Sequence, residues 1–197
     1  MQRFSTYRKN FPLLIAHLRR AEVIAAPTET AYGLLADATC NRAVKKIFKL
    51  KRRTSQKSLA LVVTDLTMAK KYGRFSKLAL KLAKKYWPGP LTMIVPARGK
   101  LATGISKNGW VGMRISSYRW LRLLIKTFGK PLTATSANLA GKQNLYSAKK
   151  VVRQLARPGL KFIVDSGNLP RRPTSTVVKV DRQKIILLRA GPIKVKI

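Results

Sequence analysis

The sequence predicts one α/β domain, and three observations indicate it. The 197 residues are enough for one domain, and 46% of them are hydrophobic, as in a globular chain that buries a core. Segments with helical periodicity alternate with short apolar runs. The sequence contains no internal repeat, low-complexity segment or long linker. We therefore expect a single domain over residues 1–197.

The elements of the first third follow from periodicity and capping residues. Apolar residues at helical spacing predict a helix over 11–20, and the run 23–26 that follows is typical of a buried strand. Asn41 can cap a helix that ends at residue 51, with its lysines on the side opposite its apolar residues. The apolar run 59–63 predicts the next strand.

The remaining elements show the same two patterns. Ser76 can cap a helix that ends at the turn 87–90, whose sequence is Trp-Pro-Gly-Pro. The other expected helices are 118–128 and 147–157, the latter capped by Ser147, and the other expected strands are 91–95, 110–115, 132–134, 162–164, 176–180 and 185–188.

The charge balance is strongly basic, with 42 Lys and Arg against 6 Asp and Glu, a formal charge of +36. Most of the basic groups therefore face water, counter-ions or a polyanion. Such a field steers nucleic acid to the surface. The alternative is a general basic bias that keeps the protein soluble, and charge alone does not identify the polyanion.

Several classes of site and location are disfavoured by composition. No apolar run approaches the roughly 18 residues that cross a bilayer, so we expect no membrane partner. The N-terminal residues lack the apolar segment of a secretory signal. The single cysteine, Cys40, rules out a disulfide within the chain and makes a reducing cytoplasm the expected location. His17 is the single histidine, so we expect no histidine-rich metal site.

Two short stretches rich in hydroxyl and amide side chains each follow an apolar run. They are 27–30, Pro-Thr-Glu-Thr, and 135–138, Thr-Ser-Ala-Asn. A strand that ends in this way places uncharged hydrogen-bonding groups at the rim of a sheet, where ligands bind in open α/β sheets. The cationic segment 49–57 lies between them in the sequence. Together the three segments predict a pocket for a small polyanion.

Two pairs of polar residues have a spacing of two. Lys51 and Arg53 would point the same way on an extended segment, where Arg offers a planar fork for phosphate and Lys a compact charge. Ser136 and Asn138 have the same spacing. Arg114 is a charge at the end of an apolar strand, and we expect an anionic substrate group to be its partner.

The sequence lacks a Cys/His dyad, a Walker-type glycine loop and a Rossmann glycine fingerprint. These absences disfavour covalent nucleophilic catalysis. They favour positioning plus charge neutralisation, as in phosphoryl and nucleotidyl transfer.

Five motifs occur in a fixed order along the sequence: Pro-Thr-Glu-Thr-Ala-Tyr-Gly at 27–33, Lys-x-Arg at 51–53, Pro-Gly-Pro-Leu-Thr at 88–92, Thr-Ser-Ala-Asn-Leu-Ala-Gly at 135–141 and Ser-Thr-Val-Val at 175–178. Together they resemble the YrdC/TsaC family, the threonylcarbamoyl-AMP synthases. The similarity extends from about residue 22 to residue 191. Each motif is a weak signal alone, and the ordered set is specific.

The resemblance implies a twisted, mixed parallel and antiparallel open sheet, flanked by helices, with a central cavity: a YrdC-like fold. It implies that L-threonine, bicarbonate and ATP react to give threonylcarbamoyl-AMP and pyrophosphate. The product would serve threonylcarbamoylation of the adenosine beside the anticodon, with tRNA or tRNA-modification proteins as partners. Mg²⁺ would be held mainly by the phosphates, because it needs few protein carboxylates.

The resemblance also assigns site residues by position. Those that match the family's catalytic tetrad are Lys51, Arg53, Ser136 and Asn138. Those that match the threonine and carbamate end are Thr28, Thr30, Arg114, Thr135 and Ser175. Those assigned to the ATP end are Lys49, Arg53, Ala137, Ser147 and Arg189, and Lys57 is a further candidate for either end.

The sequence departs from the family pattern without losing a tetrad side chain. The departures are Leu35 for a Gly, Thr54, Ser58 and Ser116 each for a Pro, and Ala140 for a Ser. Two alternatives to a synthase are kept. One is a basic RNA-binding or tRNA-binding factor of the same fold, and the other is a paralogue with altered carbamoyl chemistry, such as the YciO-like branch or the carbamoyl-transferring domain of hydrogenase maturation.

Overall fold

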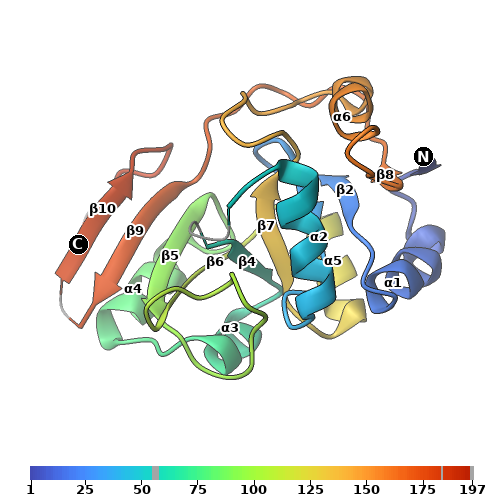
Figure 1. Cartoon of the computed structure of the whole chain (residues 1–197). Coiled ribbons are helices and arrows are strands. Elements are labelled where there is room, and N and C mark those ends of the chain that lie inside the picture. Colours follow the sequence, from blue (N-terminus) through green and yellow to red (C-terminus); the bar gives the residue numbers. More distant parts are fainter. Residues whose placement is uncertain (55–57, 183, 196–197) are drawn as a thin grey trace.

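The computed structural model describes residues 1–54, 58–182 and 184–195. These residues form a mixed sheet with the strand order β1-β8-β2-β3-β7-β4-β6-β5-β9-β10 (Figure 1). The strands are β1 (Gln2–Phe4), β2 (Ile24–Pro27), β3 (Tyr32–Leu35), β4 (Ala60–Val63), β5 (Leu91–Pro96), β6 (Trp110–Ile115), β7 (Leu132–Ser136), β8 (Phe162–Val164), β9 (Thr176–Asp181) and β10 (Lys184–Arg189).

The sheet is mixed, as the resemblance implied. The pairs β1·β8, β2·β8, β4·β6 and β5·β9 are parallel, and the pairs β2·β3, β3·β7, β4·β7, β5·β6 and β9·β10 are antiparallel. The helices that flank it are α1 (Phe11–Arg19), α2 (Asn41–Lys51), α3 (Leu66–Tyr72), α4 (Lys77–Tyr86), α5 (Arg119–Phe128) and α6 (Ala148–Leu155). The prediction of an α/β fold with a mixed open sheet is therefore confirmed.

Different helices pack on the two faces of the sheet. Successive residues of a strand point to opposite faces, so neighbouring residues contact different helices. On β4, Val62 belongs to the cluster that holds the buried residues of α1 and α5. Its neighbours Leu61 and Val63 belong to the cluster that holds those of α2, α4 and α6. Amphipathic helices therefore cover both faces of the sheet. The α1–α5 layer packs on residues of β1, β2, β3, β4, β7 and β8 and does not extend over the remaining strands.

Two of the predicted caps are formed differently from the prediction. Ser76 caps α4 as expected, with its Oγ accepting a hydrogen bond from the Ala79 N–H at 3.2 Å. Cys40, rather than Asn41, occupies the N-cap position of α2, and the Asn41 side chain accepts a hydrogen bond from Thr103 N at 2.8 Å instead. Ser147 occupies the N-cap of α6 without a capping side-chain hydrogen bond.

Four elements were not predicted from the sequence, among them the one-turn 3₁₀ helix η1 (Arg8–Asn10). β1 has three residues and α3 has seven, which is too short for a clear periodicity. β3 follows β2 directly after the 28–31 turn, and its pairing partners β2 and β7 were not deducible locally. No helix among the described residues is long and apolar enough to cross a membrane.

Candidate functional site

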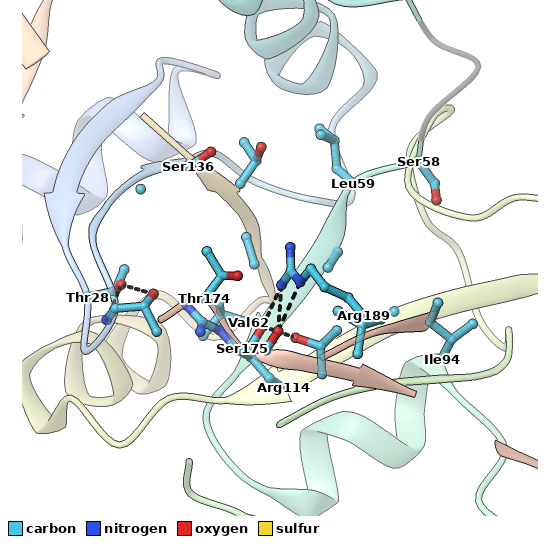
Figure 2. Close-up of a pocket in the computed structure, with 18 of the residues that line it drawn as sticks. Thr28, Ser58, Leu59, Val62, Ile94, Arg114, Ser136, Thr174, Ser175 and Arg189 are labelled. Atoms are coloured by element: carbon cyan, nitrogen blue, oxygen red, sulfur yellow. Dashed lines mark hydrogen bonds between the residues drawn. The ribbon is translucent and has the colours of Figure 1, made fainter. Parts of the chain in front are cut away.

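A cavity of about 540 Å³ lies on the sheet face that carries α1 and α5. Figure 2 shows residues from distant parts of the sequence converging on it. Among the described residues that line it, five are basic and none is acidic. The lining basic residues are Arg53, Lys107, Arg114, Lys179 and Arg189. The cavity is therefore suited to a polyanionic ligand, as the sequence predicted.

Small residues on three adjacent strands leave room for the cavity. Ala60 of β4 pairs with Ala134 of β7, and both line the cavity. Gly112 of β6 lies on the other side of Ala60, with the position of its missing Cβ 3.5 Å from the Ala60 Cβ. Larger side chains at these positions would fill the floor, so the sequence of the three strands shapes the cavity directly.

The Thr28–Thr30 turn forms one end of the cavity. The Thr28 hydroxyl donates to Ala31 O at 2.7 Å and accepts from Thr30 N at 3.1 Å. The two threonine hydroxyls are 3.1 Å apart (Figure 2). Most of the bonding capacity of the Thr28 hydroxyl is thus used to hold the turn, which presents both threonines to the cavity.

Arg114 forms a buried ion pair with a residue that the sequence analysis left without a role. Its Nη1 lies 2.8 Å from Glu29 Oε1, and the two side chains are 9% and 6% exposed. Ser116 donates a hydrogen bond to the Glu29 carboxylate. Arg114 Nε has no hydrogen-bond partner among the described residues. Glu29 therefore neutralises Arg114 in the structure, in the place where we expected an anionic substrate group.

Arg189 reaches into the cavity from the edge strand β10 and is held by Ser175. Its Nε and Nη2 donate to Ser175 O at 3.0 and 2.7 Å, and Nη2 also donates to Ser175 Oγ at 3.0 Å (Figure 2). The Ser175 hydroxyl is in turn 2.9 Å from that of Thr92. Burial, and then the nearby charge of Arg114, lower the pKa of Arg189. The two guanidinium groups create a positive potential at this part of the cavity.

The Lys-x-Arg pair is not on an extended segment, so our interpretation of its spacing was wrong. Lys51 is the last residue of α2, and Arg52 follows with a positive φ of 49°. Arg53 lines the cavity, and its Nη2 donates to Ser58 O at 3.0 Å. Burial lowers the pKa of Arg53. The left-handed residue after the helix therefore points the side chains of Lys51 and Arg53 in different directions.

Lys51 lies behind the cavity wall and holds the Ser-x-Asn segment at 136–138 by hydrogen bonds. Its ammonium donates to Ser136 O, Asn138 O and Asn138 Oδ1 at 2.5, 2.7 and 2.9 Å. Asn138 Oδ1 also accepts from the Ser136 hydroxyl at 2.6 Å. Lys51 is 2% exposed, and burial, reinforced by the charge of Arg53, lowers its pKa from 10.5 to about 8. Of the predicted tetrad, Arg53 and Ser136 line the cavity, while Lys51 and Asn138 hold the wall.

The cavity brings together eight of the predicted site residues. They are Thr28, Thr30, Arg53, Arg114, Thr135, Ser136, Ser175 and Arg189. Three predicted ATP-end residues lie elsewhere. Lys49 lines a separate pocket of about 200 Å³ with Glu22 and Lys46, Ala137 is fully buried, and Ser147 begins α6. Lys57 lies outside the described residues.

Other lining residues were missed by the sequence analysis. They include Thr92, Lys107, Asn108, Trp110, Asn144, Thr174 and Lys179. Lys179 is the clearest omission, because its alternation on β9 with Val177 already placed it on one face of the strand. Its Nζ lies 3.8 Å from the centre of the Trp110 ring. Lys107 and Asn108 come from a hairpin turn that has no local functional signal.

The described residues contain no group of three His, Cys, Asp or Glu side chains that could hold a metal ion. Glu29, the carboxylate next to the cavity, is engaged by Arg114 and Ser116. The described protein side chains therefore do not offer a Mg²⁺ site of their own.

Several known proteins are similar to this chain. Among curated relatives, the threonylcarbamoyl-AMP synthase of Psychromonas ingrahamii is 38% identical over 154 residues, which are 76% of this chain and 81% of the relative. The threonylcarbamoyl-AMP synthase of Bacillus subtilis is 35% identical over 184 residues, which are 90% of this chain and 52% of the relative.

Solved structures show the same fold. P. abyssi Sua5 complexed with L-threonine superimposes with a TM-score of 0.91 at 28% identity, over 97% of this chain and 58% of that chain. E. coli YciO superimposes with a TM-score of 0.89 at 22% identity, over 99% of this chain and 98% of that chain. The family model Sua5_yciO_yrdC, described as "Telomere recombination", matches residues 16–191. On this match and these identities, the chain belongs to the Sua5/YciO/YrdC family.

Proposed function

We propose that this protein is an L-threonylcarbamoyladenylate synthase, which condenses L-threonine, bicarbonate and ATP to threonylcarbamoyl-AMP and pyrophosphate. The observation that carries the proposal is the 540 Å³ cavity, whose described lining has five basic and no acidic side chains beside a hydroxyl-rich turn. The relatives named threonylcarbamoyl-AMP synthase and the Sua5 structure with L-threonine support the same chemistry.

The reaction needs positioning and charge neutralisation more than a covalent enzyme intermediate. The threonine amine attacks the bicarbonate carbon, and loss of water gives a carbamate. A carbamate oxygen then bonds to the α-phosphorus of ATP. The bond from that phosphorus to the bridging oxygen breaks, and its electron pair leaves with pyrophosphate. Every reactant near the phosphorus is anionic, so cations in a cavity of low dielectric lower the barrier.

We assign the residues to two tasks. Arg53, Ser136 and Arg189 line the cavity and would contact the phosphate and carbamate groups. Lys51 and Asn138 would be positioning residues, because they fix the Ser-x-Asn segment from behind. Thr28, Thr30, Thr135 and Ser175 supply hydroxyls at the threonine end, where the Glu29–Arg114 pair is nearly neutral. Mg²⁺ would arrive with the phosphates of ATP.

Several wider expectations are part of the proposal. The single-domain organisation follows from the predicted pattern of elements, and the cytoplasmic location from the single cysteine. The product would be used to modify the adenosine next to the anticodon of tRNA. The charge of +36 favours direct contact with tRNA, and it also motivates the second candidate function, an RNA-binding factor.

One experiment separates the enzyme from the binding factor. The purified protein is incubated with ATP, Mg²⁺, L-threonine and labelled bicarbonate, and the products are separated. We expect pyrophosphate and a labelled threonylcarbamoyl adenylate, both dependent on threonine. Absence of a threonine-dependent product, together with tight RNA binding at physiological salt, would establish the binding factor instead. An affinity for tRNA that falls steeply with salt and is equal for all sequences would indicate association by charge alone.

A further inference from the structure

The cavity contains two lysines, Lys107 and Lys179, that no part of the proposed reaction has used. Both line the cavity, beside Trp110. Trp110 and Arg114 line the cavity from the same strand, four residues apart, so their Cα atoms are separated by about 13 Å. The lysines therefore belong to the opposite end of the cavity from the Glu29–Arg114 pair. We refer to Lys107 and Lys179 as the distal lysine pair.

The register of the sheet places the Lys179 backbone level with the middle of β6, and its ammonium extends from there to Trp110. Lys179 of β9 pairs with Ile94 of β5, which in turn pairs with Gly112 of β6. Figure 2 shows Ile94 and Thr28 at opposite sides of the cavity. The distal lysine pair is thus remote from the Thr28–Thr30 turn, where the threonine is proposed to bind.

Both lysines are attached to well-defined backbone. The Lys107 and Trp110 backbones exchange two hydrogen bonds of 2.9 Å around a tight turn, in which Asn108 and Gly109 have φ values of 50° and 76°. Lys179 Nζ is fixed 3.8 Å from the Trp110 ring centre. Trp110 thus links the hairpin to β9, through backbone hydrogen bonds to Lys107 on one side and the ring contact with Lys179 on the other. This end of the cavity therefore contains the two lysine ammonium groups, and no acidic side chain is among its described lining residues.

The stereochemistry of the proposed reaction identifies the ligand of this end. In an in-line displacement at phosphorus, the attacking and leaving oxygens lie on opposite sides of the phosphorus atom. The attacking carbamate comes from the threonine end, so the leaving pyrophosphate departs toward the opposite end. Pyrophosphate carries several negative charges, and lysine ammonium groups suit such an ion.

We propose that the distal lysine pair binds the β- and γ-phosphates of ATP and the pyrophosphate that they become. This inference rests on the proposed function for the direction of the reaction. It adds a leaving-group subsite to the site residues and gives the lysines a defined role. They neutralise the charge that develops on the bridging oxygen when the α-phosphorus–oxygen bond breaks, and the electron pair leaves with the pyrophosphate.

The test measures binding of inorganic pyrophosphate by titration calorimetry in the absence of threonine. The variants are Lys107→Gln and Lys179→Gln, which keep most of the side-chain stem. Lys184→Gln, in an exposed part of β10 outside the cavity lining, removes the same charge and serves as the control. We expect the Kd of pyrophosphate to rise about tenfold in each cavity variant, equivalent to about 1.4 kcal/mol, and to change less than about twofold in the control.

Binding of AMP and of L-threonine is measured on the same proteins and should stay within about twofold of wild type. Unchanged pyrophosphate affinity in both cavity variants would overturn the proposal, as would equal losses for AMP and pyrophosphate. Failure of wild type to bind pyrophosphate at about 1 mM would also overturn it. Selective loss of pyrophosphate binding in a protein that makes no threonylcarbamoyl-AMP would keep the subsite and refute the proposed function, so the two failures are distinguishable. Far-ultraviolet circular dichroism confirms that each variant is folded.

Discussion

Replacing Lys51 by Met will change the way in which the stability of the protein depends on pH. The Lys51 ammonium is 2% exposed, and burial together with the charge of Arg53 lowers its pKa from 10.5 to about 8. Between these two pH values the unfolded chain binds a proton at this position and the folded chain largely does not. The free energy of unfolding therefore rises with pH in this window, and the gain is lost as the pH falls through 8.

The size of the effect follows from the two pKa values. A separation of 2.5 pKa units, from 10.5 to 8, corresponds at most to about 3 kcal/mol. Integrated between pH 7 and pH 9.5, the contribution of Lys51 to the free energy of unfolding is about 2 kcal/mol. The methionine variant has no titrating group at this position, so this part of the pH dependence should disappear.

The assay is urea unfolding at the two pH values, followed by circular dichroism. Urea is preferred to guanidinium chloride because urea is uncharged and does not screen the electrostatic interactions of a protein with a formal charge of +36. Any other contribution to the pH dependence is common to both proteins, so the difference between wild type and variant isolates Lys51. Lys49→Met is the matched control, because it removes an exposed lysine two residues earlier on α2.

The reasoning is refuted if Lys51→Met has the same difference in stability between pH 7 and pH 9.5 as wild type, within about 0.5 kcal/mol. It is also refuted if Lys49→Met loses as much of the pH dependence as Lys51→Met, since a general charge effect would then be sufficient.

Three further predictions concern the cavity. Arg53→Ala should lower kcat/KM for pyrophosphate release by at least about a hundredfold, because it removes a half-buried cation that is proposed to contact the phosphates, and the circular dichroism spectrum should not change. Glu29→Gln should lower the free energy of unfolding, measured in urea, by about 3 kcal/mol, because it leaves Arg114 buried without its counter-charge. The double variant Glu29→Gln/Arg114→Met should recover part of this loss. Gly112→Leu should abolish ATP binding by calorimetry while the midpoint of urea unfolding changes little, because the Cβ fits beside Ala60 and the outer atoms occupy the cavity.

Much of the fold could be predicted from local pattern. The helix 41–51 and the strands 110–115 and 162–164 have the predicted bounds, because each contains a continuous periodic or apolar run. The order of the strands could not be derived from the residues in this way. It places β7 between β3 and β4, and such pairings depend on contacts between residues far apart in the sequence.

The predicted site shows where local reasoning fails. The hydroxyl-rich ends of β2 and β7 do meet at one cavity, as the pattern after each strand suggested. The spacing of two between Lys51 and Arg53 was misleading, because a helix end and a left-handed residue separate their side chains. The Glu29–Arg114 pair could not be deduced either, since it joins the turn after β2 to the end of β6.

Arg189 makes the cavity wall depend on the edge of the sheet. It comes from the last strand of the sheet, and its three hydrogen bonds to Ser175 complete the wall of a cavity that begins at Thr28. An edge strand has a neighbour on one side only, so β10 can separate from β9 while the central strands stay paired. Such a local opening would withdraw Arg189 from the cavity without unfolding the core. The completeness of the cavity wall therefore depends on the pairing of an edge hairpin.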